Sequence, residues 1–175
     1  DIISQRGIRF HPSHKLKSVS DKLEFENGSK ADYDVLAGIP AHRAPEVVRT
    51  AGLAEGEWVA VDRATMRTRF ANVFAIGDVT EIKVGAGAVP KAGIFAEEQG
   101  KAAAGQIIGE IAGRPAATFA GQGYCFMETG DRRAGYLAAD FFNPAGPQVR
   151  LEAPSEQSFQ QKQEFERTRV KEWLL

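Results

Sequence analysis

The chain of 175 residues contains one cysteine, Cys125, and only three histidines. A single thiol excludes an internal disulfide and any zinc site made of cysteines alone. His11 and His14 lie three residues apart, but the sequence places no third ligand near them, so we expect no metal site. Basic and acidic side chains number 22 and 23. A chain this close to neutral has no overall field that would attract nucleic acid, so we expect no nucleic-acid partner.

Long hydrophobic runs are also missing. No apolar segment reaches the roughly 18 residues that span a bilayer, and the first residues lack the pattern of a signal peptide. We therefore expect a cytoplasmic protein, with peripheral contact at the inner face of a membrane as an alternative. That alternative rests on the predicted last helix, residues 156–175, which combines apolar and basic side chains. They are Phe159, Phe165, Trp173 and Leu174 with Lys162, Arg167, Arg169 and Lys171. Packing of this helix on the chain's own sheet or on a twofold mate is the favoured interpretation.

Hydrophobic residues make up 43% of the chain and charged residues 26%, values typical of a folded domain. Alternating patterns predict strands in the first forty residues, and Asn27-Gly28 predicts a type I′ turn between two of them. Pro40 and Pro45 predict a connection over residues 40–46. A short helix over residues 46–51, closed by Gly52, is expected next.

The apolar run Val73–Ile76 predicts a parallel strand buried on both faces. It ends at Gly77 and Asp78, and a carboxylate just beyond such a strand lies where open α/β sheets bind ligands. Considered alone, Asp78 is equally well explained as the cap of a turn.

Pro90 predicts the start of a helix that runs to about Gly113. The expected buried face of this helix comprises Ile94, Ala102, Gly105, Ile108 and Ala112. Its glycines, Gly93, Gly100, Gly105 and Gly109, indicate close approach of a sheet or a flat cofactor. Strands are then expected at residues 124–127, 136–142 and 148–152.

Two glycine-rich segments, Gly85-Ala86-Gly87 and Gly121-Gln122-Gly123, lack the third glycine of a dinucleotide-binding fingerprint. Cys125 lies between aromatic residues in a predicted strand, which favours a buried, unreactive thiol over a reactive one.

Thr68, followed after five residues by Phe74-Ala75-Ile76-Gly77-Asp78, resembles the second flavin-binding motif of the pyridine nucleotide-disulfide oxidoreductase superfamily. These flavoproteins contain two dinucleotide-binding domains. The resemblance implies an α/β fold, with part of the FAD-binding Rossmann-like sheet followed by a C-terminal α+β segment. It also implies that Gly77 packs closely against FAD and that Asp78 binds its ribityl chain.

Further segments are similar to the sulfide:quinone oxidoreductase branch of this superfamily. They are Tyr33–Pro40, Ala51–Leu53, Trp58–Asp62, Thr65–Asp78 and Val89–Gln99. Pro90 and Lys91 match the branch's Pro-Lys-Thr-Gly segment beside the isoalloxazine ring, with Ala92 in place of the threonine. The resemblance therefore gives Lys91 a role near the ring, where negative charge develops on reduction. The branch carries a redox cysteine downstream, and Cys125 stands in a comparable place as the candidate catalytic thiol.

The resemblance divides the chain into three parts. Residues 1–39 correspond to the β-rich end of the second, NADH-domain-like dinucleotide domain. Residues 40–115 correspond to the C-terminal part of the FAD-binding domain, and residues 116–175 to a C-terminal α+β segment. The glycine-rich fingerprint that holds the ADP half of FAD is missing, so we expect the C-terminal portion of a longer flavoprotein. Its main partner is then the N-terminal FAD-binding portion.

The expected activity is that of an FAD-dependent oxidoreductase, with a quinone or another small electron carrier as acceptor. Alone, the chain should bind FAD weakly or not at all, be inactive, and form a homodimer through its exposed apolar surface. Two related activities stay open, those of type II NADH:quinone dehydrogenases and of flavocytochrome sulfide dehydrogenases. A non-catalytic module is the alternative from another class.

Overall fold

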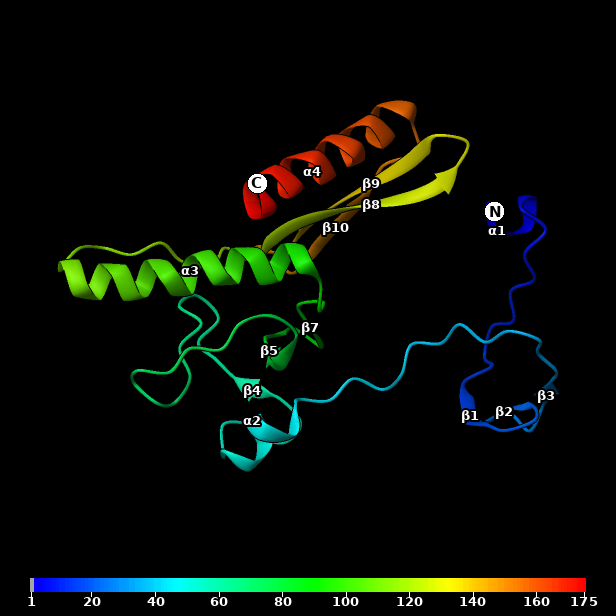
Figure 1. Cartoon of the computed structure of the whole chain (residues 1–175), viewed down its shortest axis with the longest axis horizontal. Coiled ribbons are helices and arrows are strands. Elements are labelled where there is room, and N and C mark those ends of the chain that lie inside the picture. Colours follow the sequence, from blue (N-terminus) through cyan, green and yellow to red (C-terminus); the bar gives the residue numbers. More distant parts are fainter. Residues whose placement is uncertain (1) are drawn as a thin grey trace. The chain divides into compact units, whose positions relative to one another are not determined.

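The computed structural model describes residues 2–175 and combines α-helices with several small sheets (Figure 1). The chain divides into two compact units between His42 and Arg43. This boundary falls within the connection predicted over residues 40–46. The first unit contains α1 (Ile2–Gln5) and an antiparallel sheet ordered β1-β2-β3. The strands are β1 (Leu16–Val19), β2 (Leu23–Phe25) and β3 (Lys30–Ala31). None of residues 2–42 is fully buried, so this unit has no apolar core of its own.

The turn between β2 and β3 differs from the predicted type I′ turn. Only Gly28 has a positive φ, of 84°, and Phe25 N–H donates to the carbonyl of Ser29 at 3.0 Å. The loop thus has three residues and ends at a left-handed glycine, the common alternative to a two-residue turn. The carboxamide oxygen of Asn27 accepts from the Ser29 N–H at 3.0 Å, which stabilises the longer loop.

The second unit begins with α2 (Glu46–Thr50), which ends beside Gly52 at φ 68° as predicted. Two short pairs of strands follow. Strand β4 (Val59–Ala60) pairs in parallel with β5 (Thr80–Glu81), and β6 (Lys83–Val84) pairs with β7 (Gly87–Ala88) as a hairpin. The core of this unit is built by Met66, Ile82, Val84, Val89, Phe95, Ala102, Ala103, Phe119 and Ala139.

The parallel strand predicted at Val73–Ile76 is wrong. The backbone there closes onto the preceding segment, because Thr68 N–H donates to Val73 O at 2.9 Å and Ala75 N–H donates to Met66 O at 3.1 Å. The parallel strand forms instead at β5. Asp78 therefore precedes the strand rather than following it, and lies in the 3₁₀ turn η1 (Gly77–Val79).

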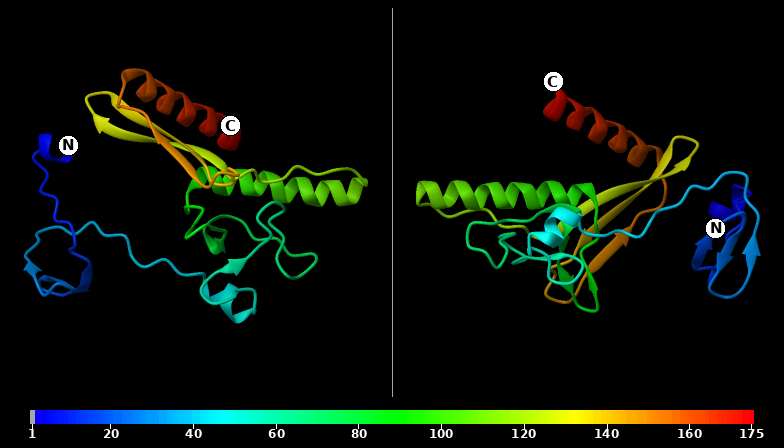
Figure 2. Two further views of the ribbon diagram at one scale, coloured as in Figure 1. Left: turned by 180° about the vertical axis from the view of Figure 1, so that it is seen from behind. Right: turned by 60° about the horizontal axis from the view of Figure 1, so that its bottom comes forward.

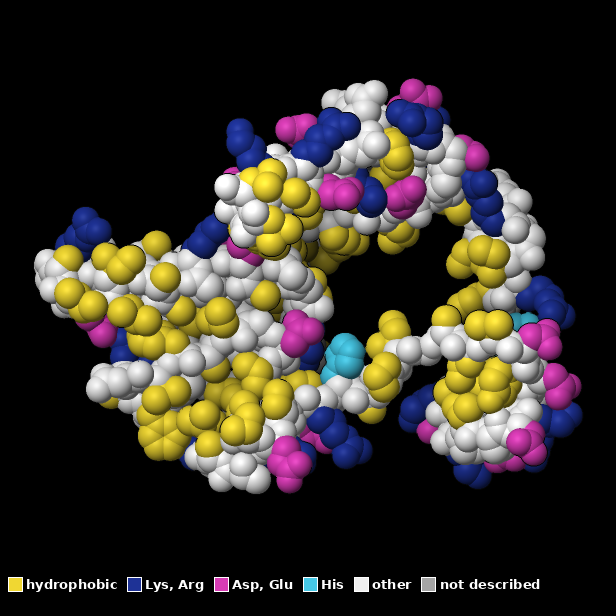
Figure 3. All heavy atoms as spheres, in the orientation of Figure 1, with side chains coloured by type: hydrophobic (Ala, Val, Ile, Leu, Met, Phe, Trp, Pro, Cys, Tyr) yellow, Lys and Arg dark blue, Asp and Glu magenta, His cyan; other side chains and the backbone are white. Residues whose placement is uncertain are grey.

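The long helix α3 (Gly93–Ala112) starts three residues later than predicted and ends at Gly113, φ 62°. Its buried face was predicted largely wrongly: the buried residues are Phe95, Gln99, Ala102, Ala103 and Gly109, and Ile108 is exposed. The glycine-rich stripe is approached by the returning chain, since a Cβ on Gly109 would lie 2.8 Å from Arg114 O. Figure 3 shows apolar side chains gathered along α3.

The last part of the chain forms the predicted strands and helix. Strands β8 (Gln122–Gly130), β9 (Arg133–Asp140) and β10 (Gln148–Leu151) form an antiparallel sheet in the order β10-β9-β8. Helix α4 (Glu156–Leu174) lies against this sheet (Figure 2). Phe165 of α4 contacts Tyr124 and Phe126 of β8 at centroid distances of 5.8 and 6.3 Å. The favoured packing of this helix on its own sheet is therefore confirmed for Phe165, whereas Trp173 and Leu174 are exposed.

Within residues 2–175, no helix is long and apolar enough to cross a membrane.

Candidate functional site

Four of the five predicted site residues line one small cavity of about 10 Å³. Gly77 and Asp78 reach it from η1, and Pro90 and Lys91 reach it from the segment before α3. The full lining is Gly77, Asp78, Thr80, Ile82, Val89, Pro90, Lys91, Ala92, Phe95, Ala96 and Gln99. The cavity admits about one water molecule. A larger ligand can therefore contact only its outer residues, of which the exposed Asp78 is one.

Gly77 adopts a backbone conformation that favours glycine, with φ 70°. A Cβ at this position would lie 3.4 Å from the Cβ of Ala96 in α3. The Gly77 carbonyl accepts from the Thr80 N–H and, at 2.8 Å, from the Thr80 hydroxyl. These bonds hold the turn without the Asp78 carboxylate, which leaves that carboxylate at the surface as an acceptor.

The ammonium group of Lys91 faces the backbone of the same turn. Its Nζ donates to Asp78 O at 2.7 Å and to Thr80 O at 2.6 Å, and lies 3.6 Å from the centroid of the Trp58 ring. Burial lowers the pKa of Lys91, while the charges of Asp78 and Glu81 oppose that shift. Lys91 thus links the start of α3 to η1 and places a positive charge beside Asp78.

Gln99 was missed as a site residue. It is only 4% exposed, and its Oε1 accepts a 2.6 Å hydrogen bond from the Gly77 N–H. Gln99 follows Phe95 by four positions, so the two side chains lie on the same face of α3. Because Phe95 is buried, this spacing is the sequence signal that places Gln99 in the core.

Cys125 does not join these four residues. It is exposed on β8, so the interpretation of a buried thiol is wrong. Cys125 lies between Tyr124 and Phe126, whose rings contact Phe165 of α4. It lines the larger cavity described next and not the small cavity at Gly77.

A second cavity, of about 640 Å³, lies between the start of α3, β8 and α4. Its lining is mostly apolar: Ala92, Gly93, Ile94, Glu97, Tyr124, Cys125, Phe126, Lys162, Phe165, Glu166, Arg169, Val170, Trp173 and Leu174. Ala92 also lines the small cavity, so the two are adjacent. The volume falls in the range of small-molecule sites.

An ion pair joins the two helices beside this second cavity. Arg169 Nε of α4 donates to Glu97 Oε2 of α3 at 3.0 Å, and Lys101 Nζ lies 2.7 Å from Glu97 Oε1. Burial acts to raise the pKa of Glu97, but the hydrogen bond from Lys101 and the charge of Arg169 outweigh it, so the pKa lies below its ordinary value. Glu97 is therefore charged at neutral pH and holds the C-terminal half of α4 to α3.

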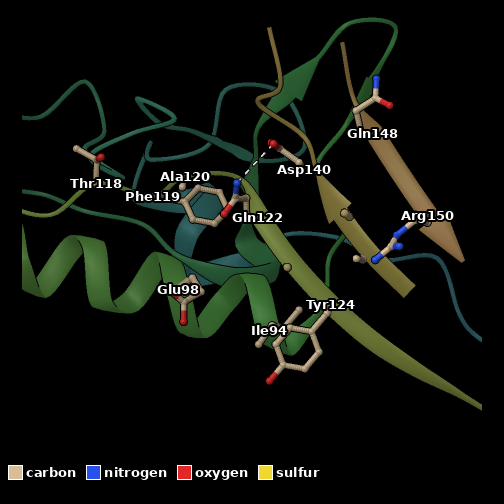
Figure 4. A pocket seen from close by; sticks show the side chains of 13 residues that line it. Ile94, Glu98, Thr118, Phe119, Ala120, Gln122, Tyr124, Asp140, Gln148 and Arg150 are labelled. Atoms are coloured by element: carbon tan, nitrogen blue, oxygen red, sulfur yellow. Dashed lines mark hydrogen bonds between the residues drawn. The ribbon is translucent and has the colours of Figure 1, made fainter. Parts of the chain in front are cut away.

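A third cavity, of about 690 Å³, shares Ile94 and Tyr124 with the second cavity and is also lined by residues of β9 and β10 (Figure 4). Asp140 accepts from the Phe142 N–H at 3.1 Å and from Gln122 Nε2 at 3.5 Å. Figure 4 shows Glu98 and Arg150 on different elements and apart from this pair. Because its polar groups do not converge on one point, this cavity is a weaker candidate than the cluster at Gly77.

Neither a protein-family model nor a curated protein matches the sequence.

Proposed function

We propose that η1 and the start of α3 bind the ribityl chain and ring of FAD in an FAD-dependent oxidoreductase similar to the sulfide:quinone oxidoreductase branch. The observation that carries this proposal is the convergence of Gly77-Asp78 with Pro90-Lys91. These pairs are separated along the chain, and each matches a flavin-contacting motif of that branch.

The residues present fit the proposed cofactor at its ribityl end. The exposed Asp78 carboxylate can accept hydrogen bonds from ribityl hydroxyl groups. Lys91 places its ammonium group beside Asp78, where it would stabilise negative charge on a bound ring. Gly93 borders open space, because a Cβ there would meet no atom within 4 Å. A ring can therefore approach the start of α3 closely, outside the small cavity.

When bound, FAD supplies the electron transfer itself, and the chain supplies orientation and charge. Under this proposal residues 1–39 belong to the second dinucleotide domain, and residues 40–115 to the Rossmann-like FAD domain, which includes the β4–β5 pair. Residues 116–175 form the C-terminal segment. The ADP half of FAD is held by a portion outside this chain. The apolar cavity beside α3 is the proposed place for a quinone or another small acceptor.

Cys125 decides between the two electron donors that the resemblance leaves open. It is the proposed redox thiol if the donor is sulfide, and its exposure on β8 allows a second thiol to reach it. In the longer flavoprotein, Cys125→Ser is expected to abolish sulfide oxidation. A donor such as NADH, which needs no thiol, should be oxidised at an unchanged rate. Full sulfide oxidation by the variant would remove Cys125 from the reaction.

The proposal is tested by titrating the chain itself with FMN at millimolar concentration and measuring the amide chemical shifts by NMR. FMN carries the ring and ribityl chain of FAD without its ADP half. We expect shifts at Gly77, Asp78 and Lys91, and none there with ADP as the matched control. Shifts confined to other segments, or equal shifts with ADP, would contradict a flavin site at η1.

A further inference from the structure

The side chain of Gln99 is polar although it lies on the buried face of α3. The other buried residues of α3 are Phe95, Ala102, Ala103 and Gly109. Burying an amide group costs free energy unless its polar atoms are hydrogen-bonded. For Gln99 the partner is the N–H of Gly77 at 2.6 Å. The buried Gln99 side chain is therefore hydrogen-bonded to one backbone group of the proposed site, the Gly77 N–H.

The Gly77 residue is fixed from both sides of its backbone. Its N–H donates to Gln99, and its carbonyl accepts from Thr80. Ala96, three residues before Gln99 on α3, lies next to Gly77, since a Cβ on Gly77 would be 3.4 Å from the Ala96 Cβ. Helix α3 thus orients the turn by a hydrogen bond and packs directly against it.

Lys91 and Gln99 hold the same turn from two places along the chain. Lys91 binds the carbonyls of Asp78 and Thr80 just before α3 begins, and Gln99 binds the N–H of Gly77 from within α3. The bond from Gly77 uses only the oxygen of the carboxamide. The two Nε2–H donors remain for a small molecule in the cavity that Gln99 lines.

We infer that Gln99 is a positioning residue for the ligand site at Gly77 and Asp78. By accepting from the Gly77 N–H it sets the orientation of η1 and hence the direction in which Asp78 presents its carboxylate. The identity of the ligand rests on the proposed function, whereas the effect of Gln99 on the turn does not.

The direct test is made on the wild-type chain by NMR. A hydrogen bond between Gly77 N–H and the Gln99 side chain should give a scalar correlation between the Gly77 nitrogen and the Gln99 Cδ. Gln99→Met removes the acceptor and should speed amide exchange at Gly77 by about 2- to 10-fold. Gln99→Glu keeps an oxygen in the same place and should retain most of the protection. Gln106→Met is the matched control, because Gln106 also lies on α3 and its Nε2 donates to a backbone oxygen, Ala117 O, at 3.0 Å.

An absent correlation together with unchanged Gly77 exchange in Gln99→Met would overturn the inference. If Gln99→Met fails to fold, the wild-type correlation and Gln99→Glu still decide. Titration with FMN then separates this inference from the proposed function. Loss of FMN-induced shifts at Asp78 in Gln99→Met, but not in Gln106→Met, supports both. A wild-type chain that shows the correlation, but whose FMN-induced shifts are confined to other segments, supports the positioning role and contradicts the flavin site.

Discussion

The Oε1 atom of Gln99 lies 2.6 Å from the backbone nitrogen of Gly77, and this bond joins the middle of α3 to a turn 22 residues earlier. Gly77 and Gln99 belong to two segments, Thr65–Asp78 and Val89–Gln99, that are well separated along the chain. Their hydrogen bond places both segments in one structural unit with Lys91. The properties of this unit lead to measurable consequences.

Gly77→Ala is expected to lower the free energy of unfolding by about 1–2 kcal/mol, because a left-handed φ is costly for a residue with a Cβ. The substituted Cβ would lie 3.4 Å from the Cβ of Ala96, in ordinary contact, so the cost comes from the backbone conformation. Urea denaturation measures the change. Gly93→Ala is the control: its Cβ would meet no neighbour within 4 Å, and alanine favours a helix start over glycine. Equal stability of wild type and Gly77→Ala would contradict the observed turn.

Lys91→Met is expected to destabilise the chain by about 1–2 kcal/mol at pH 7, through loss of the hydrogen bonds to Asp78 O and Thr80 O. The pKa of Lys91 is lowered in the folded chain, so between that value and about 10.4 the unfolded chain binds more protons. Wild-type stability from this group therefore rises with pH in that window, and the gap to Lys91→Met should widen. Denaturation curves from pH 7 to 10.5 measure the gap. Lys83→Met, at an exposed lysine on β6, should show neither effect.

Glu97→Gln is expected to lower the free energy of unfolding by about 1–2 kcal/mol at pH 7, because it removes the charge that binds Arg169 and Lys101. The pKa of Glu97 is lowered on folding. Its contribution is therefore complete above the ordinary glutamate pKa of about 4.3 and is lost as the pH falls through the lowered value. The difference from wild type should vanish at low pH. Glu98→Gln, at the more exposed partner of Lys101, should change stability by less than about 0.5 kcal/mol. A gap that persists at pH 2.5 would rule out the ion pair as its cause.

Local patterns predicted most of the elements in this chain. The strand-like composition over β8–β10, the proline-bounded connection and the glycine after α2 are short-range signals, and each gave the correct element. The long hairpin β8–β9 needs no distant partner, which explains why its strands were found.

The elements that sequence failed to predict depend on contacts with segments outside the element itself. Val73–Ile76 has the composition of a buried strand, but Thr68 and Met66 take its hydrogen bonds. The buried face of α3 depends on residues Arg114–Ala117, which return along the helix. The helical repeat in the sequence does not show where this segment packs. The close approach of Lys91 to the Asp78 carbonyl was likewise not visible in the sequence, although both residues were named from motifs. Gln99 was not predicted as a site residue because its hydrogen-bond partner is a backbone group, the Gly77 N–H.

The measurement that tests the account most directly is made on Asp78→Ala in the longer flavoprotein that we propose. Both the FAD dissociation constant and the melting temperature are determined on the same variant. Bonds from Thr80 and Gln99 hold the turn, so the melting temperature should stay close to that of wild type. A charged acceptor for a sugar hydroxyl contributes roughly 1.5–3 kcal/mol, so FAD should bind about 10- to 150-fold more weakly. An unchanged dissociation constant together with a lowered melting temperature would make Asp78 the cap of a turn and contradict the flavin site.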